Sequence, residues 1–66
     1  MNITLNGEPT TVSDSSTVID LLCKLELTGK RVAVEVNGDI VPRSLHSTHQ
    51  LSDGDQVEVV VAVGGG

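Results

Sequence analysis

The chain opens with Met1-Asn2-Ile3-Thr4-Leu5-Asn6-Gly7, the stretch that does most to decide its fold. Apolar and polar residues alternate up to Leu5, which is the period of a strand with one buried face. Asn-Gly follows at once and predicts a tight hairpin turn, because both residues tolerate positive φ. Thr10-Thr11-Val12 resumes the alternation as a return strand. Pro9 has no N–H for a ladder, so we expect it near the turn or facing an open edge.

The next segment predicts the main helix. Thr17 precedes Asp20 in a Thr-x-x-Asp spacing, which is close to that of a capping box. Apolar residues then recur with the spacing of an amphipathic helix, at Val18, Leu21, Leu22 and Leu25. Gly29 can take the left-handed conformation just beyond a helix and is the natural stop. We expect a helix of roughly ten residues, with one apolar face lying on a sheet.

Two more strands and a second Asn-Gly turn are expected after the helix. Residues 31–36 alternate strongly and place three valines on one face of an inner strand: Val32, Val34 and Val36. Asn37-Gly38-Asp39 predicts a turn into a short return strand, Ile40-Val41, which Pro42 ends.

The remaining residues predict a crossover and a final strand. Residues 44–50 have no clear period and indicate an irregular crossover with one helical turn, tied to the core by Leu45 and Leu51. Ser52-Asp53-Gly54-Asp55 predicts a third turn. The final strand, residues 56–63, places alternate valines on one face: Val57, Val59, Val61 and Val63.

This order of elements predicts an α+β domain. Strands arranged around a single helix give a mixed sheet with the helix packed across one face. A last strand separated from the first by the whole chain commonly pairs with it in parallel, in the middle of the sheet. That arrangement is the β-grasp, or ubiquitin-like, fold. We expect one β-grasp domain over residues 1–63 and a flexible glycine tail over residues 64–66.

Composition narrows the class of protein. The chain has no aromatic residue, so its core must be aliphatic. Cys23 is the only cysteine, and neither a signal peptide nor a transmembrane span is apparent, so we expect a cytoplasmic protein without membrane contact. The formal charge is −5, from nine acidic and four basic residues. This acidity and the missing aromatic residues argue against nucleic-acid binding and favour a partner with a basic face.

Side chains that often carry chemistry are sparse. Cys23 lies on the flank of the predicted helix, and we interpret it as a small buried thiol. His46 and His49 lack further ligands for a metal, so we interpret them as exposed. Asp53-Gly54-Asp55 lacks the other positions of a calcium loop and fits a turn. We therefore expect no catalytic side chain, no metal site and no bound cofactor.

The remaining chemical candidate is the terminal sequence Gly64-Gly65-Gly66. Glycines after a strand add nothing to a core and lose much entropy when ordered. One interpretation is a frayed end or a remnant of cloning. The other is a thin tail that carries an α-carboxylate into another protein's active site. A free carboxylate is ionised at pH 7 and is a poor electrophile, so it would need activation with ATP as an acyl-adenylate.

Several stretches resemble the small β-grasp sulfur carrier family of bacterial thiamine biosynthesis. They are residues 1–7, 17–22, 34–43 and 51–55, together with the terminal glycines. A Gly-Gly end alone is weak evidence. Here it is joined to Val41-Pro42-Arg43 after the central hairpin and to Asp53-Gly54-Asp55 before the last strand, and the combination is specific.

The resemblance implies a cycle in which Gly66 is the working residue. A ubiquitin-activating-like adenylyltransferase would consume ATP to adenylylate Gly66. A sulfur supplied indirectly by a persulfide enzyme would replace AMP to give a thiocarboxylate, and thiazole synthase would take up that sulfur. Gly65, with Gly64 before it, would be the flexible approach threaded into the partners' active sites. The carrier would be a monomer when free and a protein cosubstrate, not an enzyme.

Other functions share the same features. The small subunit of molybdopterin synthase has the same fold and tail chemistry, but its family tends to carry Phe and Pro shortly before the glycines, where this chain has Val60-Val61-Ala62-Val63. A ubiquitin-like modifier would be conjugated through Gly66 to lysines of other proteins. A non-reactive interaction module would lose no function with its tail.

Overall fold

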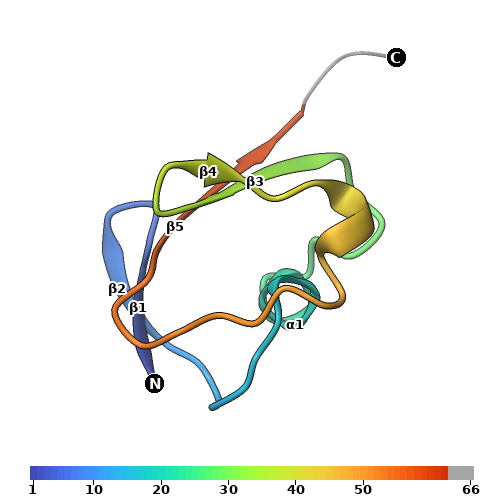
Figure 1. The fold of residues 1–66 in the computed structure, drawn as a ribbon. Helices are drawn as coiled ribbons and strands as arrows, with labels where there is room; N and C mark the ends of the chain where they lie inside the picture. Colours follow the sequence, from blue (N-terminus) through green and yellow to red (C-terminus); the bar gives the residue numbers. More distant parts are fainter. Residues whose placement is uncertain (63–66) are drawn as a thin grey trace.

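A computed structural model describes residues 1–62 of the chain. Figure 1 shows a curved sheet with an α-helix packed against one of its faces. The elements in chain order are β1 (Asn2–Leu5), β2 (Glu8–Thr11), α1 (Val18–Lys24), β3 (Val32–Val36), β4 (Asp39–Ile40), the 3-10 helix η1 (Arg43–Leu45) and β5 (Gln56–Val61).

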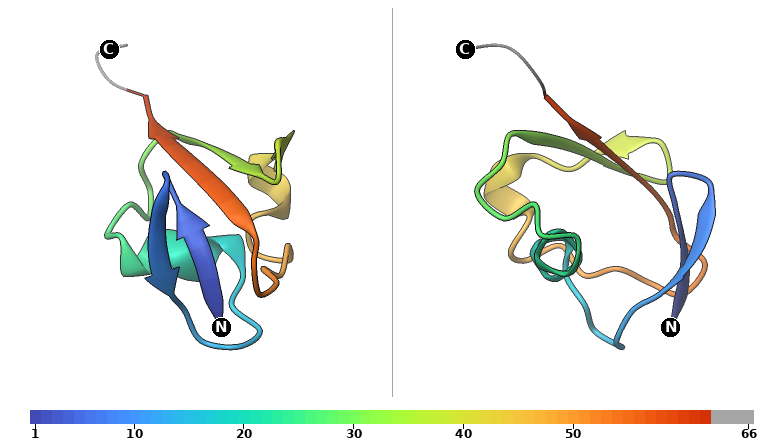
Figure 2. Two further views of the ribbon diagram at one scale, coloured as in Figure 1. Left: turned by 90° about the vertical axis from the view of Figure 1, so that its left-hand side faces the viewer. Right: turned by 180° about the vertical axis from the view of Figure 1, so that it is seen from behind.

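The last described strand, β5, is the central strand of the sheet. The spatial order is β2-β1-β5-β3-β4. β5 runs parallel to β1, with Thr4 opposite Gln56, and antiparallel to β3, with Val34 opposite Val59. Figure 2 shows β5 crossing the sheet between the N-terminal hairpin and β3. The predicted α+β fold of the β-grasp type, with its last strand parallel to the first, is confirmed.

The N-terminal hairpin follows the prediction. Asn6 and Gly7 have φ values of 49° and 83°, the positive angles that a two-residue hairpin turn between β1 and β2 requires. Pro9 lies opposite Thr4 in β2, which is an edge strand, so its missing N–H breaks no ladder inside the sheet.

Helix α1 starts as predicted and ends earlier than predicted. Thr17 Oγ1 accepts a hydrogen bond from Asp20 N at 3.3 Å, and Asp20 Oδ2 accepts one from Thr17 N at 2.9 Å, which completes a capping box. Gly29 is not the stop. The left-handed residue after the helix is Glu26, with φ of 59°. Leu27 N donates to Leu22 O at 2.8 Å across it, as in a Schellman motif.

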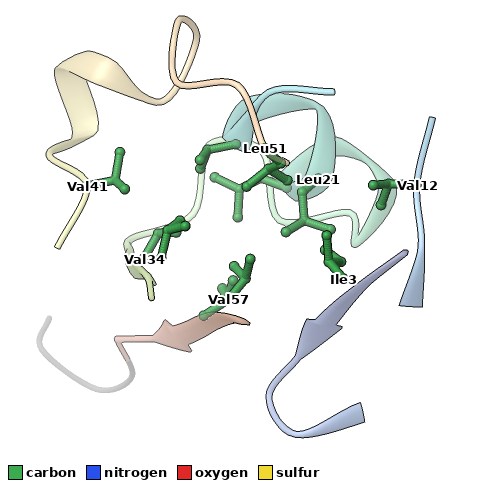
Figure 3. Close-up of a cluster of buried hydrophobic side chains, with 11 residues drawn as sticks. Ile3, Val12, Leu21, Val34, Val41, Leu51 and Val57 are labelled. Carbon is green, nitrogen blue, oxygen red and sulfur yellow. The ribbon is translucent and has the colours of Figure 1, made fainter. Parts of the chain in front are cut away.

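The core lies between α1 and the sheet and is wholly aliphatic. Figure 3 shows side chains from the helix, the strands and the crossover meeting there. The most deeply buried are Val18, Leu21, Val34 and Val57. Leu51 ties the crossover to this core, as predicted. The expectation for Leu45 is wrong: its side chain is 48% exposed, and the neighbouring His46, 4% exposed, is buried instead.

Candidate functional site

The predicted site residues Gly64, Gly65 and Gly66 lie outside the described residues, so their roles stay predictions. The structure describes the strand that leads to them. β5 pairs along both edges, and Ala62 N donates to Arg31 O at 2.9 Å just beyond its end. The chain is therefore held by the sheet up to Ala62.

The side chains of two asparagines in the turns also form hydrogen bonds to β5. Asn6 Oδ1 accepts a hydrogen bond from Val59 N at 2.9 Å, and Asn6 Nδ2 donates to Val59 O at 3.2 Å. Near the start of the strand, Asn37 Oδ1 accepts from Gln56 N at 2.9 Å. The Asn-Gly dipeptides predicted the turns, but the local pattern could not show that their side chains reach β5.

A groove of about 390 Å³ lies where the connection between α1 and β3 approaches η1 and the end of β5. Figure 1 shows this connection and η1 at the same side of that view. We call it the basic groove, because its lining includes Lys30, Arg31 and Arg43. Ala62, the last described residue, also lines it. No local pattern in the sequence indicates this site, because the fold brings together residues that are separated along the chain.

The interpretation of Cys23 as a buried thiol is wrong, because its side chain is exposed. Residues of an α-helix are about 100° apart around the axis, so Cys23 lies about 100° from Leu22 and about 160° from Leu21. Both leucines are buried against the sheet. Cys23 therefore points away from the apolar face and not along its flank.

The two histidines have different surroundings. The expectation that His46 is exposed is wrong: its Nε2 lies 3.0 Å from Val41 O, inside the fold, where the Nε2-protonated tautomer donates a hydrogen bond. His49 is half-buried. Within residues 1–62 there is no group of three or more His, Cys, Asp or Glu side chains placed to hold a metal.

The acidic turn before β5 has a structural role, as predicted. Asp53 Oδ1 accepts a hydrogen bond from Asn2 N at 2.7 Å, and Asp55 Oδ2 accepts one from Ser52 N at 2.8 Å. Gly54 has φ of 89°, which favours glycine. The carboxylates thus fix the turn and the N-terminal strand.

Among the helices described, none has the length and apolar character needed to cross a bilayer.

Comparison with known proteins gives consistent matches over the chain. The model of the ThiS family matches residues 3–66. The sulfur carrier protein ThiS of Escherichia coli is 32% identical over 66 residues and covers the whole of both chains. The sulfur carrier protein ThiS of Bacillus subtilis is 40% identical over 53 residues, which is 80% of each chain. The crystal structure of a thiamine biosynthesis protein (ThiS) from Geobacter metallireducens superposes with a TM-score of 0.84 at 39% identity over the full length of both chains.

The chain also matches part of a larger protein. It is 42% identical over 66 residues to a protein named thiazole synthase from Paramagnetospirillum magneticum, and it spans 20% of that protein's length. A thiazole synthase from Magnetococcus marinus matches in the same way, at 41% identity over 66 residues and 20% of its length.

Proposed function

This chain belongs to the ThiS family, and we propose that it is a sulfur carrier of thiamine biosynthesis whose working residue is Gly66. The observation that carries the proposal is the family match over residues 3–66, which includes all three terminal glycines. A second support is the end-to-end match to a protein named sulfur carrier protein ThiS. The folded body docks on an enzyme, and the tail presents the carboxylate.

The chemistry takes place at the Gly66 carboxylate. Attack of this carboxylate on the α-phosphate of ATP releases pyrophosphate and gives an acyl-adenylate. A persulfide sulfur then attacks the acyl carbon and AMP leaves. Reduction of the resulting acyl disulfide by a second thiol releases the thiocarboxylate, which donates its sulfur for thiazole formation. ATP is consumed by the partner enzyme, and the carrier is a cosubstrate with no catalytic side chain of its own.

Glycine is suited to the approach to such a site. A chain without side chains can pass through a narrow channel, and Gly65 and Gly64 provide this access to the two partner active sites. The ordering of a glycine tail costs conformational entropy, which the docking of the folded body must offset. The folded body thus docks while the tail enters the active site, and this separation of roles fits the way the sheet holds β5 and Ala62 before the glycines begin.

The proposed partners are an adenylyltransferase of the ubiquitin-activating type, a persulfide enzyme acting through it, and thiazole synthase. The match of this chain to 20% of proteins named thiazole synthase supports the last of these, because a similar segment there belongs to the same polypeptide. The free carrier is a monomer in the cytoplasm, and this part of the proposal rests on sequence alone.

An intact-mass experiment tests the proposal. The chain is incubated with ATP, the activating adenylyltransferase and a sulfur source, and we expect the mass increase for the exchange of one carboxylate oxygen by sulfur. A variant with Gly66 deleted and a variant with one residue added after Gly66 are the controls. Both should keep their fold by circular dichroism and lose ATP–pyrophosphate exchange. Retained exchange by the extended variant would contradict the carrier function.

The two competing functions make different predictions. A carrier for molybdopterin synthase would restore growth of a strain that lacks that subunit, whereas we expect rescue of a thiamine auxotroph. A protein modifier would give isopeptide-linked adducts in cell extract, and these would show as a ladder above the free chain in a blot.

A further inference from the structure

The basic groove concentrates the positive charge of an acidic protein. The chain has four Lys and Arg residues and nine Asp and Glu residues. Three of the four basic residues, Lys30, Arg31 and Arg43, line the groove, and none of the nine acidic residues does. The remaining surface therefore carries one basic residue, Lys24, and nine acidic ones. Such a separation of charge orients an approaching charged partner.

The three basic side chains are open to a partner. All three residues are exposed. Within residues 1–62 the only ion pair joins the Met1 amino group to Asp14, so no described carboxylate neutralises them. Isolated cations on a surface are common and need no explanation. Three basic side chains around one groove, in a chain with only four basic residues, form a surface suited to an acidic partner.

The floor of the groove is apolar. Ile19 and Leu22 of α1 line it together with Leu27 and Val32, and all four belong to the core or pack against it. With a volume of about 390 Å³, the groove falls within the size range of pockets that hold small ligands or a few side chains. Its preferred occupant therefore combines an apolar side chain with negative charge.

The position of the groove places it close to any enzyme that binds the tail. Ala62 lines the groove, and the four residues from 63 to 66 span at most about 14 Å when fully extended. Any enzyme that holds Gly66 in its active site therefore has its surface within that reach of the groove. This step rests on the proposed function of Gly66.

We infer that the basic groove is the docking site for an acidic segment of the activating adenylyltransferase, a segment that carries carboxylates beside an apolar side chain. The apolar side chain enters the groove, and the carboxylates pair with Lys30, Arg31 and Arg43. This contact holds the folded body while the tail is threaded. Arg43 is thus a partner contact.

Charge reversal with a matched control tests the inference. Lys30→Glu, Arg31→Glu and Arg43→Glu each change the net charge by −2 at the groove, and Lys24→Glu makes the same change elsewhere. The measurement is the KM for the carrier in ATP–pyrophosphate exchange with the adenylyltransferase, at low and at high salt. We expect KM to rise about tenfold or more for each groove variant at low salt and to change less than twofold for Lys24→Glu. The difference should shrink at high salt.

Zero-length cross-linking gives a second measurement that does not depend on a variant's fold. A carbodiimide joins a lysine amine to a carboxylate with loss of water, and the chain has only two lysines, Lys24 and Lys30. In the parent protein with the adenylyltransferase and ATP, we expect an amide between Lys30 Nζ and an Asp or Glu of the enzyme, located by peptide mass spectrometry. Lys24 should give none. Lys30→Arg should lose the cross-link, whereas Lys24→Arg should keep it.

The outcomes separate this inference from the proposed function. If the parent supports exchange but the groove variants match Lys24→Glu and Lys30 gives no cross-link, the docking site is wrong and the carrier function stands. If the parent supports no exchange, both are wrong. If the groove variants lose binding to thiazole synthase but not to the adenylyltransferase, the occupant proposed here is wrong. Normal KM values with inorganic phosphate bound at the groove would indicate a small-anion site and also overturn the proposal.

Discussion

The side-chain amide of Asn6 pairs with the backbone of Val59 as a neighbouring strand would. Its Oδ1 accepts from Val59 N at 2.9 Å and its Nδ2 donates to Val59 O at 3.2 Å. The parallel pairing of β1 with β5 ends at Leu5 opposite Val57, and Asn6 N still donates to Val57 O at 2.9 Å. The side chain thus continues the β1 edge after the backbone has turned away, and its two hydrogen bonds hold β5 at Val59.

Asn6→Asp should lower the stability of the domain. The carboxylate keeps the acceptor for Val59 N, but it loses the Nδ2 donor and places negative charge near Val59 O. We expect a loss of about 1–3 kcal/mol in the free energy of unfolding, measured by urea denaturation at neutral pH. Asn6→Gly, which keeps the turn but removes both hydrogen bonds, is the companion variant. Parent-like stability in both would show that the amide pairing contributes nothing.

Glu26→Gly should raise the stability. Glu26 holds the left-handed position after α1, with φ of 59°, where glycine has no steric penalty. Among residues 1–62, no hydrogen bond or ion pair involves the Glu26 side chain, so its removal loses no described interaction. We expect a gain of about 1 kcal/mol in thermal or urea unfolding. Glu26→Ala keeps the strained backbone and should show no such gain, and an equal gain in both variants would rule out relief of strain as the cause.

Glu58→Lys should also stabilise the sheet. Glu58 of β5 lies directly opposite Glu35 of β3, and like charges at such positions repel. Reversal of one charge replaces repulsion by attraction, with an expected gain of about 0.5 kcal/mol at low salt that falls as salt is added. Glu58→Gln should give part of the gain. A gain that does not depend on salt would point to strand propensity and not to charge.

Cys23→Ala should change little, because the side chain is exposed and outside the core. The free energy of unfolding should shift by less than about 1 kcal/mol, and thiocarboxylate formation should proceed at the parent rate. The same exposure predicts that a thiol reagent labels Cys23 in the folded protein as fast as in urea. Slow labelling of the folded protein would contradict the exposed position. Loss of thiocarboxylate in a folded Cys23→Ala protein would give the thiol a role in sulfur transfer.

The features predicted correctly are those set by neighbouring residues. The turn at Asn6-Gly7 needs positive φ at both positions, and the capping box needs only Thr17 and Asp20. The errors occur where packing between distant segments decides. Leu45 is the more apolar residue of the crossover, yet His46 is buried because its ring reaches Val41 O. In the same way, Lys30 and Arg43 share a groove only after folding, so no local pattern indicates it.

The helix end shows a third kind of error. Gly29 suits a stop by residue type, and it does have a positive φ of 82°. The helix nevertheless ends at Lys24, because Leu27 packs against the core once Glu26 has turned the chain. The conformational preference of glycine favours a helix stop at Gly29, but the free energy gained by burying an apolar side chain such as Leu27 can outweigh that preference.

A final pair of substitutions separates the body from the tail. Leu22, 3% exposed, belongs to the aliphatic core, and Leu22→Ala should cost about 2–5 kcal/mol. That is a large part of the stability of so small a domain, so thiocarboxylate yield should fall with the folded fraction. Lowering the temperature should raise the folded fraction and the thiocarboxylate yield together.

Gly65→Val should have the opposite profile. Gly65 follows the held segment that ends at Ala62, so its replacement should leave the melting temperature near that of the parent. A β-branched side chain restricts the backbone and adds bulk where a narrow channel must admit the chain. We therefore expect a large loss of thiocarboxylate yield in a fully folded protein, with KM raised less than kcat is lowered, because the basic groove still docks. Melting curves and mass-detected yield on the same samples give both quantities. A Gly65→Val protein that forms thiocarboxylate at the parent rate would show that the glycines are incidental, and one that unfolds would show that they are structural.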